Sequence, residues 1–255
     1  MQNQREAVAA YLARIGYEGP VTATPQVLRA VHYAHIHAVP YENLDIIRGI
    51  PVSLEIPALF DKIVTRRRGG YCFELNALLA WLLRAMGFEV TDYFARFLRG
   101  ETALPKRRHH VLRVETAEGP FLCDVGVGTG VSRVPLHFAE DEPQTFEGET
   151  YRLARHADHG WQVEEHYKGE WRAVYCFTEE KQYPVDYVAI HYFCQHAPES
   201  VFNKDAMVSL RTATGRNTVA GDEFRVFSGD DVRVWTPGSD AERAEALKTC
   251  FGIVL

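Results

Sequence analysis

Apolar residues recur at helical spacing through the first third of the chain. Four of them between positions 8 and 15 repeat at intervals of three or four, which predicts a helix over residues 4–15. Thr24 and Pro25 are typical of the start of a second helix, and Pro40 marks its end. A third helix is expected over residues 54–67.

A fourth helix is expected to begin at or near Cys72, directly after the sharp turn that Gly69 and Gly70 allow. Apolar residues form one stripe from position 75 to position 86, and Gly87 ends it. Unpaired N–H groups and the positive end of the helix dipole favour an anion at this place. The sequence therefore predicts a lowered pKa for the Cys72 thiol.

The apolar pattern then changes from a period of 3.6 to a period of two. Strands are expected over residues 88–98, 110–115, 121–125, 151–155, 161–167 and 171–177. Short strands at such close spacing are typical of a meander or a small barrel. The last part of the chain is expected to hold a helix over 184–197, strands over 206–212, 223–227 and 231–236, and a helix over 241–250 that Ser239 caps.

These elements predict an α+β fold in three parts. Residues 1–87 form a helical N-terminal subdomain, residues 88–200 a β-barrel-like middle subdomain, and residues 201–255 a C-terminal α/β lid. No internal repeat and no low-complexity linker separates them, so we expect the three parts to pack as one body.

Charge excludes one class of function. The chain of 255 residues has a formal net charge of −6, whereas a protein that binds duplex nucleic acid normally presents a clustered basic face. Residues 66–68 and 106–108 are the basic clusters. We expect solvated turn charges there, with local anion binding as the alternative.

The pattern of cysteines and the N-terminal residues indicate the cellular compartment of the protein. Five scattered cysteines do not resemble a disulfide framework, and the absence of a C-x-x-C pair argues against structural zinc. The N-terminal residues read as an amphipathic helix and not as a secretion signal, and no segment approaches the ~20 apolar residues that span a bilayer. We therefore expect a cytoplasmic protein without a membrane partner.

A cysteine, two histidines and an aspartate, residue types suited to nucleophilic catalysis, stand at the ends of these predicted elements. Two adjacent histidines, His109 and His110, open one predicted strand, and Asp124 ends the next. Residues 117–120 read as a hairpin turn, which brings a histidine and Asp124 to the same end of the sheet. With Cys72 facing that end, imidazole would accept the thiol proton and the carboxylate would orient the imidazole. The alternatives are a cysteine that packs as a small hydrophobe and an aspartate that caps a turn.

The segment R-G-G-Y-C-F-E-L-N at 68–76, followed by H-H-V-L-R-V at 109–114 and D-V-G-V-G at 124–128, resembles the arylamine N-acetyltransferases. Further similar stretches are V-P-Y-E-N-L-D at 39–45, A-R-F at 95–97, P-L at 135–136 and P-E-S-V-F at 198–202. The resemblance implies that Cys72 is the nucleophile of a catalytic triad with cysteine-protease-like geometry and that Asp124 is its carboxylate.

The resemblance also selects between the two histidines. In the family, the triad histidine is followed by a valine five places on and by the triad aspartate fifteen places on. His109 satisfies both, with Val114 and Asp124. Neighbours in a strand face opposite sides, so only one imidazole is expected to face Cys72.

Further site residues follow from the same resemblance. Gly126 and Gly128 are expected in a tight turn whose amides contact the coenzyme A pyrophosphate, and Ser200 at a second coenzyme A contact or as a cap. A dinucleotide fold is disfavoured, because G-x-G-x-G lacks the spacing of G-x-G-x-x-G. Tyr41 and Phe97 match positions that bind the aromatic acceptor, with a core role as the alternative.

The implied activity is transfer of acetyl from acetyl-coenzyme A to arylamines and arylhydrazines, as in xenobiotic metabolism. The mechanism would be ping-pong through an acetyl-cysteine, without a metal, in a monomer or homodimer. One rival is an amide synthase of the same fold that closes a macrolactam. The other rivals are a Cys-His-Asp hydrolase or transglutaminase-like enzyme and a noncatalytic binding module.

Overall fold

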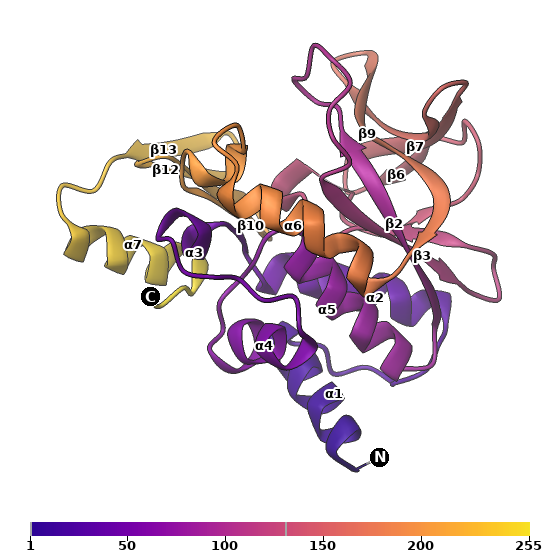
Figure 1. Cartoon of the computed structure of the whole chain (residues 1–255), viewed down its shortest axis with the longest axis horizontal. Helices are drawn as coiled ribbons and strands as arrows, with labels where there is room; N and C mark the ends of the chain where they lie inside the picture. Colours follow the sequence, from indigo (N-terminus) through magenta and orange to yellow (C-terminus); the bar gives the residue numbers. More distant parts are fainter. Residues whose placement is uncertain (1, 131) are drawn as a thin grey trace.

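The computed structural model describes residues 2–130 and 132–255 (Figure 1). Thr24 caps the second helix as predicted, since its side-chain oxygen accepts a hydrogen bond from the N–H of Val27. The α-helices are α1 (Gln2–Ile15), α2 (Pro25–Ala38), α3 (Leu44–Ile47), α4 (Ile56–Phe60), α5 (Cys72–Ala85), α6 (Tyr187–His196) and α7 (Asp240–Phe251). Among the described residues, none of the helices combines the length and the apolar character needed to cross a membrane.

The single helix predicted over residues 54–67 is wrong. Helix α4 ends at Phe60, and a π-helical turn, η1 (Asp61–Thr65), follows it. Within this turn the ammonium of Lys62 is buried. It forms ion pairs with the carboxylates of Asp45, over 2.9 Å, and Glu74, over 2.8 Å. These ion pairs join segments that are distant in the sequence, and the apolar period carries no information about them.

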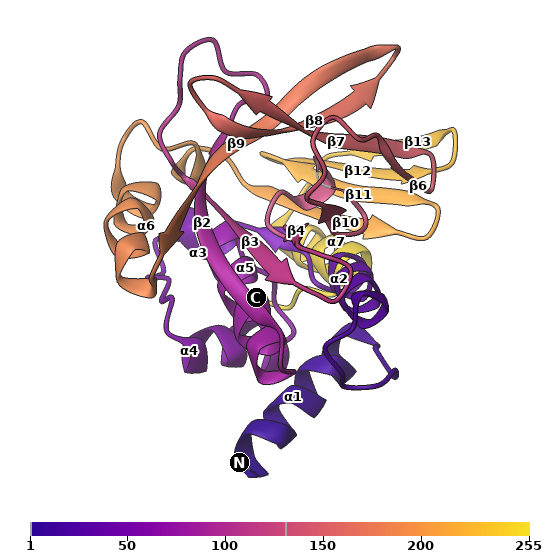
Figure 2. The same ribbon diagram turned by 90° about the vertical axis from the view of Figure 1, so that its right-hand side faces the viewer.

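Within the described residues, the larger sheet has eight antiparallel strands in the order β5-β4-β3-β2-β9-β8-β7-β6. They are β2 (Glu89–Phe97), β3 (His109–Glu115), β4 (Phe121–Cys123), β5 (Leu136–His137), β6 (Gln144–Phe146), β7 (Glu149–His156), β8 (Gly160–Tyr167) and β9 (Glu170–Gln182). The larger sheet is strongly curled, as the strands from β3 to β7 show (Figure 2). Strand β5 thereby contacts β7, and a parallel bridge joins Glu140 to Leu153. The barrel-like arrangement predicted from the strand spacing is therefore confirmed.

The second sheet joins the beginning of the chain to its end. Its strands are β1 (Tyr41–Glu42), β10 (Met207–Thr212), β11 (Gly215–Ala220), β12 (Glu223–Ser228) and β13 (Asp231–Trp235), in that order. Strand β1 pairs with β10, so the N-terminal and C-terminal parts share a sheet. Neither β1 nor β11 was among the strands predicted from the sequence. The boundaries at residues 87 and 200 remain a prediction.

Helix α5 is the centre of the main core. Leu75, Leu78 and Leu82 are fully buried, and the helix packs on β2 and β3. Burial of each such leucine stabilises the fold by about 1.5–3 kcal/mol. The residue that begins this helix, Cys72, is thereby held against the large sheet.

Helices before the sheets, and α7 at the end, confirm the predicted α+β class.

Candidate active site

The turn before Cys72 requires its two glycines. A Cβ on Gly69 would overlap the carbonyl oxygen of Pro40, and one on Gly70 would lie 2.8 Å from the Glu74 side chain. That Glu74 carboxylate accepts a hydrogen bond of 3.1 Å from the N–H of Tyr71, directly before the helix. The glycines thus let Glu74 fold back and fix the point at which α5 begins.

A buried network of ion pairs stabilises this turn. The guanidinium of Arg68 pairs with Glu42 at 2.8 Å and with Asp45 at 3.0 Å, and all three residues are buried. Lys62 links Asp45 to Glu74. The expectation of a solvated charge or an anion site is therefore wrong for Arg68, because the guanidinium is already paired within the protein.

His109 and Asp124 form a direct pair. The Nε2–H of His109 donates to Oδ2 of Asp124 over 2.7 Å, and both side chains are buried. The predicted hairpin brings them together, with Leu112 of β3 opposite Cys123 of β4. Burial alone would raise the pKa of Asp124, but the charge and hydrogen bond of His109, together with other donors, hold it below its ordinary value.

Cys72 and His109 line one cavity of about 220 Å³. Because Nε2 of His109 is bonded to Asp124, Nδ1 is the ring nitrogen left for other partners. His110 is oriented differently, since its Nε2 bonds Asp92 Oδ1 over 2.9 Å. The structure therefore pairs Asp124 with His109 and not with His110. Further residues that line the cavity are Tyr41, Phe97, Arg108, Gly126, Val127, Val201, Phe202 and Met207.

The prediction of a lowered pKa for the Cys72 thiol is wrong. Burial of the side chain, which is 2 % exposed, raises the pKa of Cys72 well above its ordinary value, and the negative charge of Asp124 adds to this. Hydrogen bonds from the backbones of His110 and Phe73 lower it less. Desolvation therefore outweighs the helix start, and a thiolate at this position needs a cation beside it.

Gly126 and Gly128 allow close approach to the helix and to the second sheet. A Cβ on Gly126 would lie 2.7 Å from the Cα of Cys72 and 2.6 Å from the side-chain nitrogen of Asn76. Gly128 has a φ of +62°, and a Cβ there would overlap the hydroxyl of Ser209. Any side chain at Gly126 would therefore displace the nucleophile.

Ser200 acts as a cap in the structure. Its hydroxyl donates to the carbonyl of Cys194 over 2.6 Å and accepts from the N–H of Phe202 over 3.2 Å. The side chain is buried and is not part of the wall of the Cys72 cavity. It fixes the turn η4 (Val201–Asn203), from which Val201 and Phe202 reach the cavity.

Asn76 is a site residue that the sequence analysis did not single out. Its amide nitrogen donates to Asp124 Oδ1 over 2.9 Å and to the carbonyl of His110 over 2.6 Å, and its oxygen accepts from the N–H of Val125. The signal was its position four residues after Cys72, which places both on one face of the helix. Tyr175 was also missed; its hydroxyl interacts with Asp124, and its ring lies 5.2 Å from that of His109.

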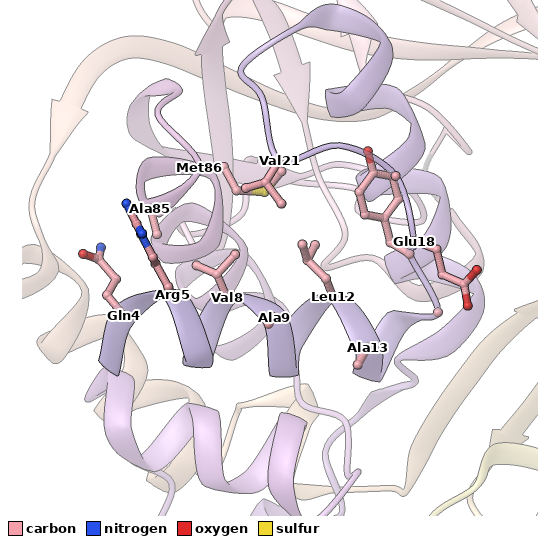
Figure 3. Close-up of a pocket in the computed structure, with 13 residues that line it drawn as sticks. Gln4, Arg5, Val8, Ala9, Leu12, Ala13, Glu18, Val21, Ala85 and Met86 are labelled. Atoms are coloured by element: carbon pink, nitrogen blue, oxygen red, sulfur yellow. The ribbon is translucent and has the colours of Figure 1, made fainter. Parts of the chain in front are cut away.

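A larger hollow, of about 920 Å³, lies elsewhere (Figure 3). It runs along α1 and is lined by Val8, Leu12, Val21 and Met86. It contains none of the predicted site residues, so its size does not identify it as the active site.

Among residues 2–130 and 132–255, no group of three His, Cys, Asp or Glu side chains is arranged to hold a metal ion.

Comparison with known proteins gives consistent results. A family model described as N-acetyltransferase matches residues 24–255. The arylamine N-acetyltransferase of Mycolicibacterium smegmatis is 36% identical over 96% of this chain and 91% of its own length, and that of Escherichia coli is 35% identical over 80% and 73%. The solved arylamine N-acetyltransferase of Salmonella typhimurium superimposes with a TM-score of 0.91 at 28% identity, covering 97% of this chain and 91% of that one. A solved complex of the Mycobacterium marinum enzyme with CoA has a TM-score of 0.89 at 32% identity, covering 96% and 92%.

Proposed function

Because the chain belongs to the arylamine N-acetyltransferase family and is an acyltransferase, we propose that it transfers acetyl from acetyl-coenzyme A to arylamines and arylhydrazines through Cys72. The observation that carries this proposal is the pairing of His109 with Asp124 in a cavity that Cys72 also lines. Arylamines as acceptors follow from the names of the relatives, arylhydrazines from the sequence resemblance, and the donor from the CoA complex of the Mycobacterium marinum enzyme.

In the first half-reaction, Nδ1 of His109 accepts the thiol proton of Cys72. The resulting imidazolium is the cation that a buried thiolate requires, and Asp124 stabilises it. The sulfur then attacks the thioester carbonyl, and the bond from that carbon to the coenzyme A sulfur breaks. Coenzyme A leaves with the proton from His109, and Cys72 remains acetylated.

In the second half-reaction, a neutral arylamine attacks the acetyl-cysteine. His109 takes a proton from the attacking nitrogen, and the Cys72 sulfur leaves as the amide forms. An aromatic amine suits this step, because its low basicity leaves its nitrogen unprotonated at neutral pH. The N–H of Cys72 lies in the first turn of α5 and has no intrahelical partner, so it is our candidate donor to each oxyanion.

The cavity volume limits the acceptor. About 220 Å³ is below the range of roughly 300–1,000 Å³ typical of drug-sized ligands, which favours a single-ring amine over the long acyl chain of a macrolactam. We propose that the rings of Tyr41 and Phe97, both in the cavity wall, pack against this amine.

Coenzyme A would approach along the turn that contains Gly126 and Gly128. The N–H of Gly126 donates to Asp124 Oδ1 over 2.8 Å, so we propose that other backbone amides of this turn contact the pyrophosphate, while the two glycines set the path of the turn. Ser200 would contribute by fixing the η4 turn beside the same cavity.

The test is mass spectrometry of the intact protein after brief exposure to acetyl-coenzyme A without acceptor. One acetyl group on Cys72 is expected, and a subsequent pulse of aniline should remove it as acetanilide. Cys72→Ser should give no thioester-labile acetyl, whereas the partly exposed Cys250→Ser should label like the natural protein. Label that persists in Cys72→Ser, or release to water without amine at the same rate, would refute the proposal.

A further inference from the structure

The peptide group that follows the proposed catalytic carboxylate lies just outside the sheet. Strand β4 ends at Cys123, so the carbonyl of Asp124 and the N–H of Val125 are beyond its ladder of hydrogen bonds. Asp124 is 5 % exposed and Val125 is 4 % exposed. Buried backbone groups need partners, and here side chains from elsewhere in the chain must supply them.

Two helices supply these partners. The side-chain oxygen of Asn76, on α5, accepts a hydrogen bond of 3.0 Å from the N–H of Val125. On the other side, Nε2 of His32, on α2, lies 3.1 Å from the carbonyl oxygen of Asp124. His32 is 2 % exposed, so little water reaches this contact. The peptide unit between Asp124 and Val125 is thus held at both its N–H and its C=O.

The ring of His32 faces a second carbonyl as well. Its Nδ1 lies 3.2 Å from the carbonyl oxygen of Arg133. Burial lowers the pKa of His32 to about 4, although the two carbonyls and the charge of Asp124 act in the opposite direction, so the ring is neutral near pH 7. A neutral imidazole has one N–H and can donate to only one of the two carbonyls.

Burial decides which carbonyl receives this proton. The contact of His32 with the Asp124 carbonyl is fully buried, whereas its contact with the Arg133 carbonyl is partly buried, and Arg133 itself is partly exposed. An unbonded carbonyl is most costly where water cannot replace the missing donor. The tautomer with its proton on Nε2, which serves Asp124, is therefore favoured.

We propose that His32 is a positioning residue for acetyl transfer, which donates from Nε2–H to the Asp124 carbonyl and thereby fixes the peptide from which the carboxylate projects. Oδ2 of Asp124 bonds Nε2 of His109 over 2.7 Å, so a rotation of this peptide would turn the carboxylate away from the imidazole. His109 would then be oriented less well toward Cys72. His32 is not part of the wall of the Cys72 cavity, so it acts only through Asp124. The catalytic consequence rests on the proposed function.

Two substitutions separate the two carbonyls. The amide nitrogen of His32→Gln lies near the place of Nε2 and can still donate to Asp124, whereas that of His32→Asn lies near the place of Nδ1 and can donate only to Arg133. The rate of Cys72 acetylation in a single turnover with acetyl-coenzyme A should fall about tenfold to a hundredfold in His32→Asn and no more than about threefold in His32→Gln. The acetyl-coenzyme A concentration that gives half of the maximal rate should not change in either variant.

His37→Gln is the matched control on the same helix. Nδ1 of His37 contacts the carbonyl of Tyr33, within α2, over 2.7 Å. This substitution should leave the acetylation rate at its natural value. A loss in His37→Gln equal to that in His32→Asn would show a general effect of α2 and would overturn the proposal.

A second readout does not depend on acetyl transfer. The pH midpoint of Cys72 alkylation by iodoacetamide reports on the ion pair with His109, and it should rise by about half a pH unit or more in His32→Asn but not in His32→Gln. A natural protein that takes no acetyl group from acetyl-coenzyme A would refute the proposed function. The alkylation curves would still test whether His32 positions Asp124.

The tautomer can be read in the natural protein, so the test does not require that a variant folds. Long-range ¹H–¹⁵N NMR of the histidine rings at pH 7 should show the proton of His32 on Nε2, with the ring assigned through its neighbours on α2. A proton on Nδ1 would overturn the proposal. So would equal acetylation rates and equal alkylation midpoints in His32→Gln and His32→Asn.

Discussion

His109 and Asp124 meet at the open end of one hairpin, where the imidazole Nε2 and a carboxylate oxygen are 2.7 Å apart. The next residue, His110, makes its carboxylate contact with Asp92 on a different strand. The alternation of a β-strand therefore assigns two adjacent histidines to two different carboxylates.

This assignment predicts unequal effects of two matched substitutions. His109→Gln should lower kcat/KM for acetyl transfer by about 10³-fold or more, because it removes both the proton acceptor and the imidazolium. His110→Gln should cost no more than about tenfold, since it changes a side chain behind the nucleophile. Steady-state kinetics with p-anisidine would measure both, and comparable losses would contradict the assignment.

The pH dependence of alkylation should reveal the ion pair of Cys72 and His109. Burial raises the pKa of the isolated Cys72 thiol, so its reactivity in His109→Asn should appear only well above the ordinary cysteine value of about 8.5. In the natural protein the imidazolium would offset this, and the half-maximal rate should lie at least one pH unit lower. Iodoacetamide labelling read by mass spectrometry gives both curves, with Cys250 as the internal reference. Superimposable curves would exclude the ion pair.

Gly126→Ala should disable the site without removing any chemical group. The added Cβ would lie within 3 Å of Cys72 and of the Asn76 amide, so the nucleophile and the carboxylate support must shift. We expect a loss of about 1–3 kcal/mol in the free energy of unfolding and a lower rate of Cys72 acetylation. Gly238→Ala is the control, because a Cβ there meets only the flexible end of Glu242 at 3.4 Å. Natural activity in Gly126→Ala would show that the clash is relieved.

Acid should destabilise the fold through His35. Burial lowers the pKa of His35 from 6.5 to about 3, so its contribution to stability is complete above pH 6.5 and is lost as the pH falls toward 3. Between pH 7 and pH 5 this amounts to about 2 kcal/mol. Tyr11 shares a hydrogen bond of 3.0 Å with His35, so the double variant Tyr11→Phe/His35→Phe should flatten the slope without leaving a polar orphan. Urea unfolding at both pH values measures it. An unchanged slope, or an equal effect of the exposed His166→Gln, would count against His35.

Local patterns carried much of the fold and of the site. The glycine pair before Cys72, the capped start of α2 and the hairpin between β3 and β4 all depend on neighbouring residues, and the structure contains each of them. Strand β1 could not be predicted from such local patterns. It has two residues, and its partner β10 lies more than 160 positions away.

The sequence by itself determined where each chemical group stands along the chain: a cysteine that begins a helix, a histidine and an aspartate at the two ends of one hairpin. The tertiary structure decided their environment. Burial set the direction of the Cys72 pKa against the helix start, the ion pairs of Lys62 accompany the split in the predicted third helix, and Asn76 joined Asp124 to the nucleophile helix. Local geometry follows from neighbours in the chain, whereas desolvation and charge pairing depend on what packs against a residue from elsewhere.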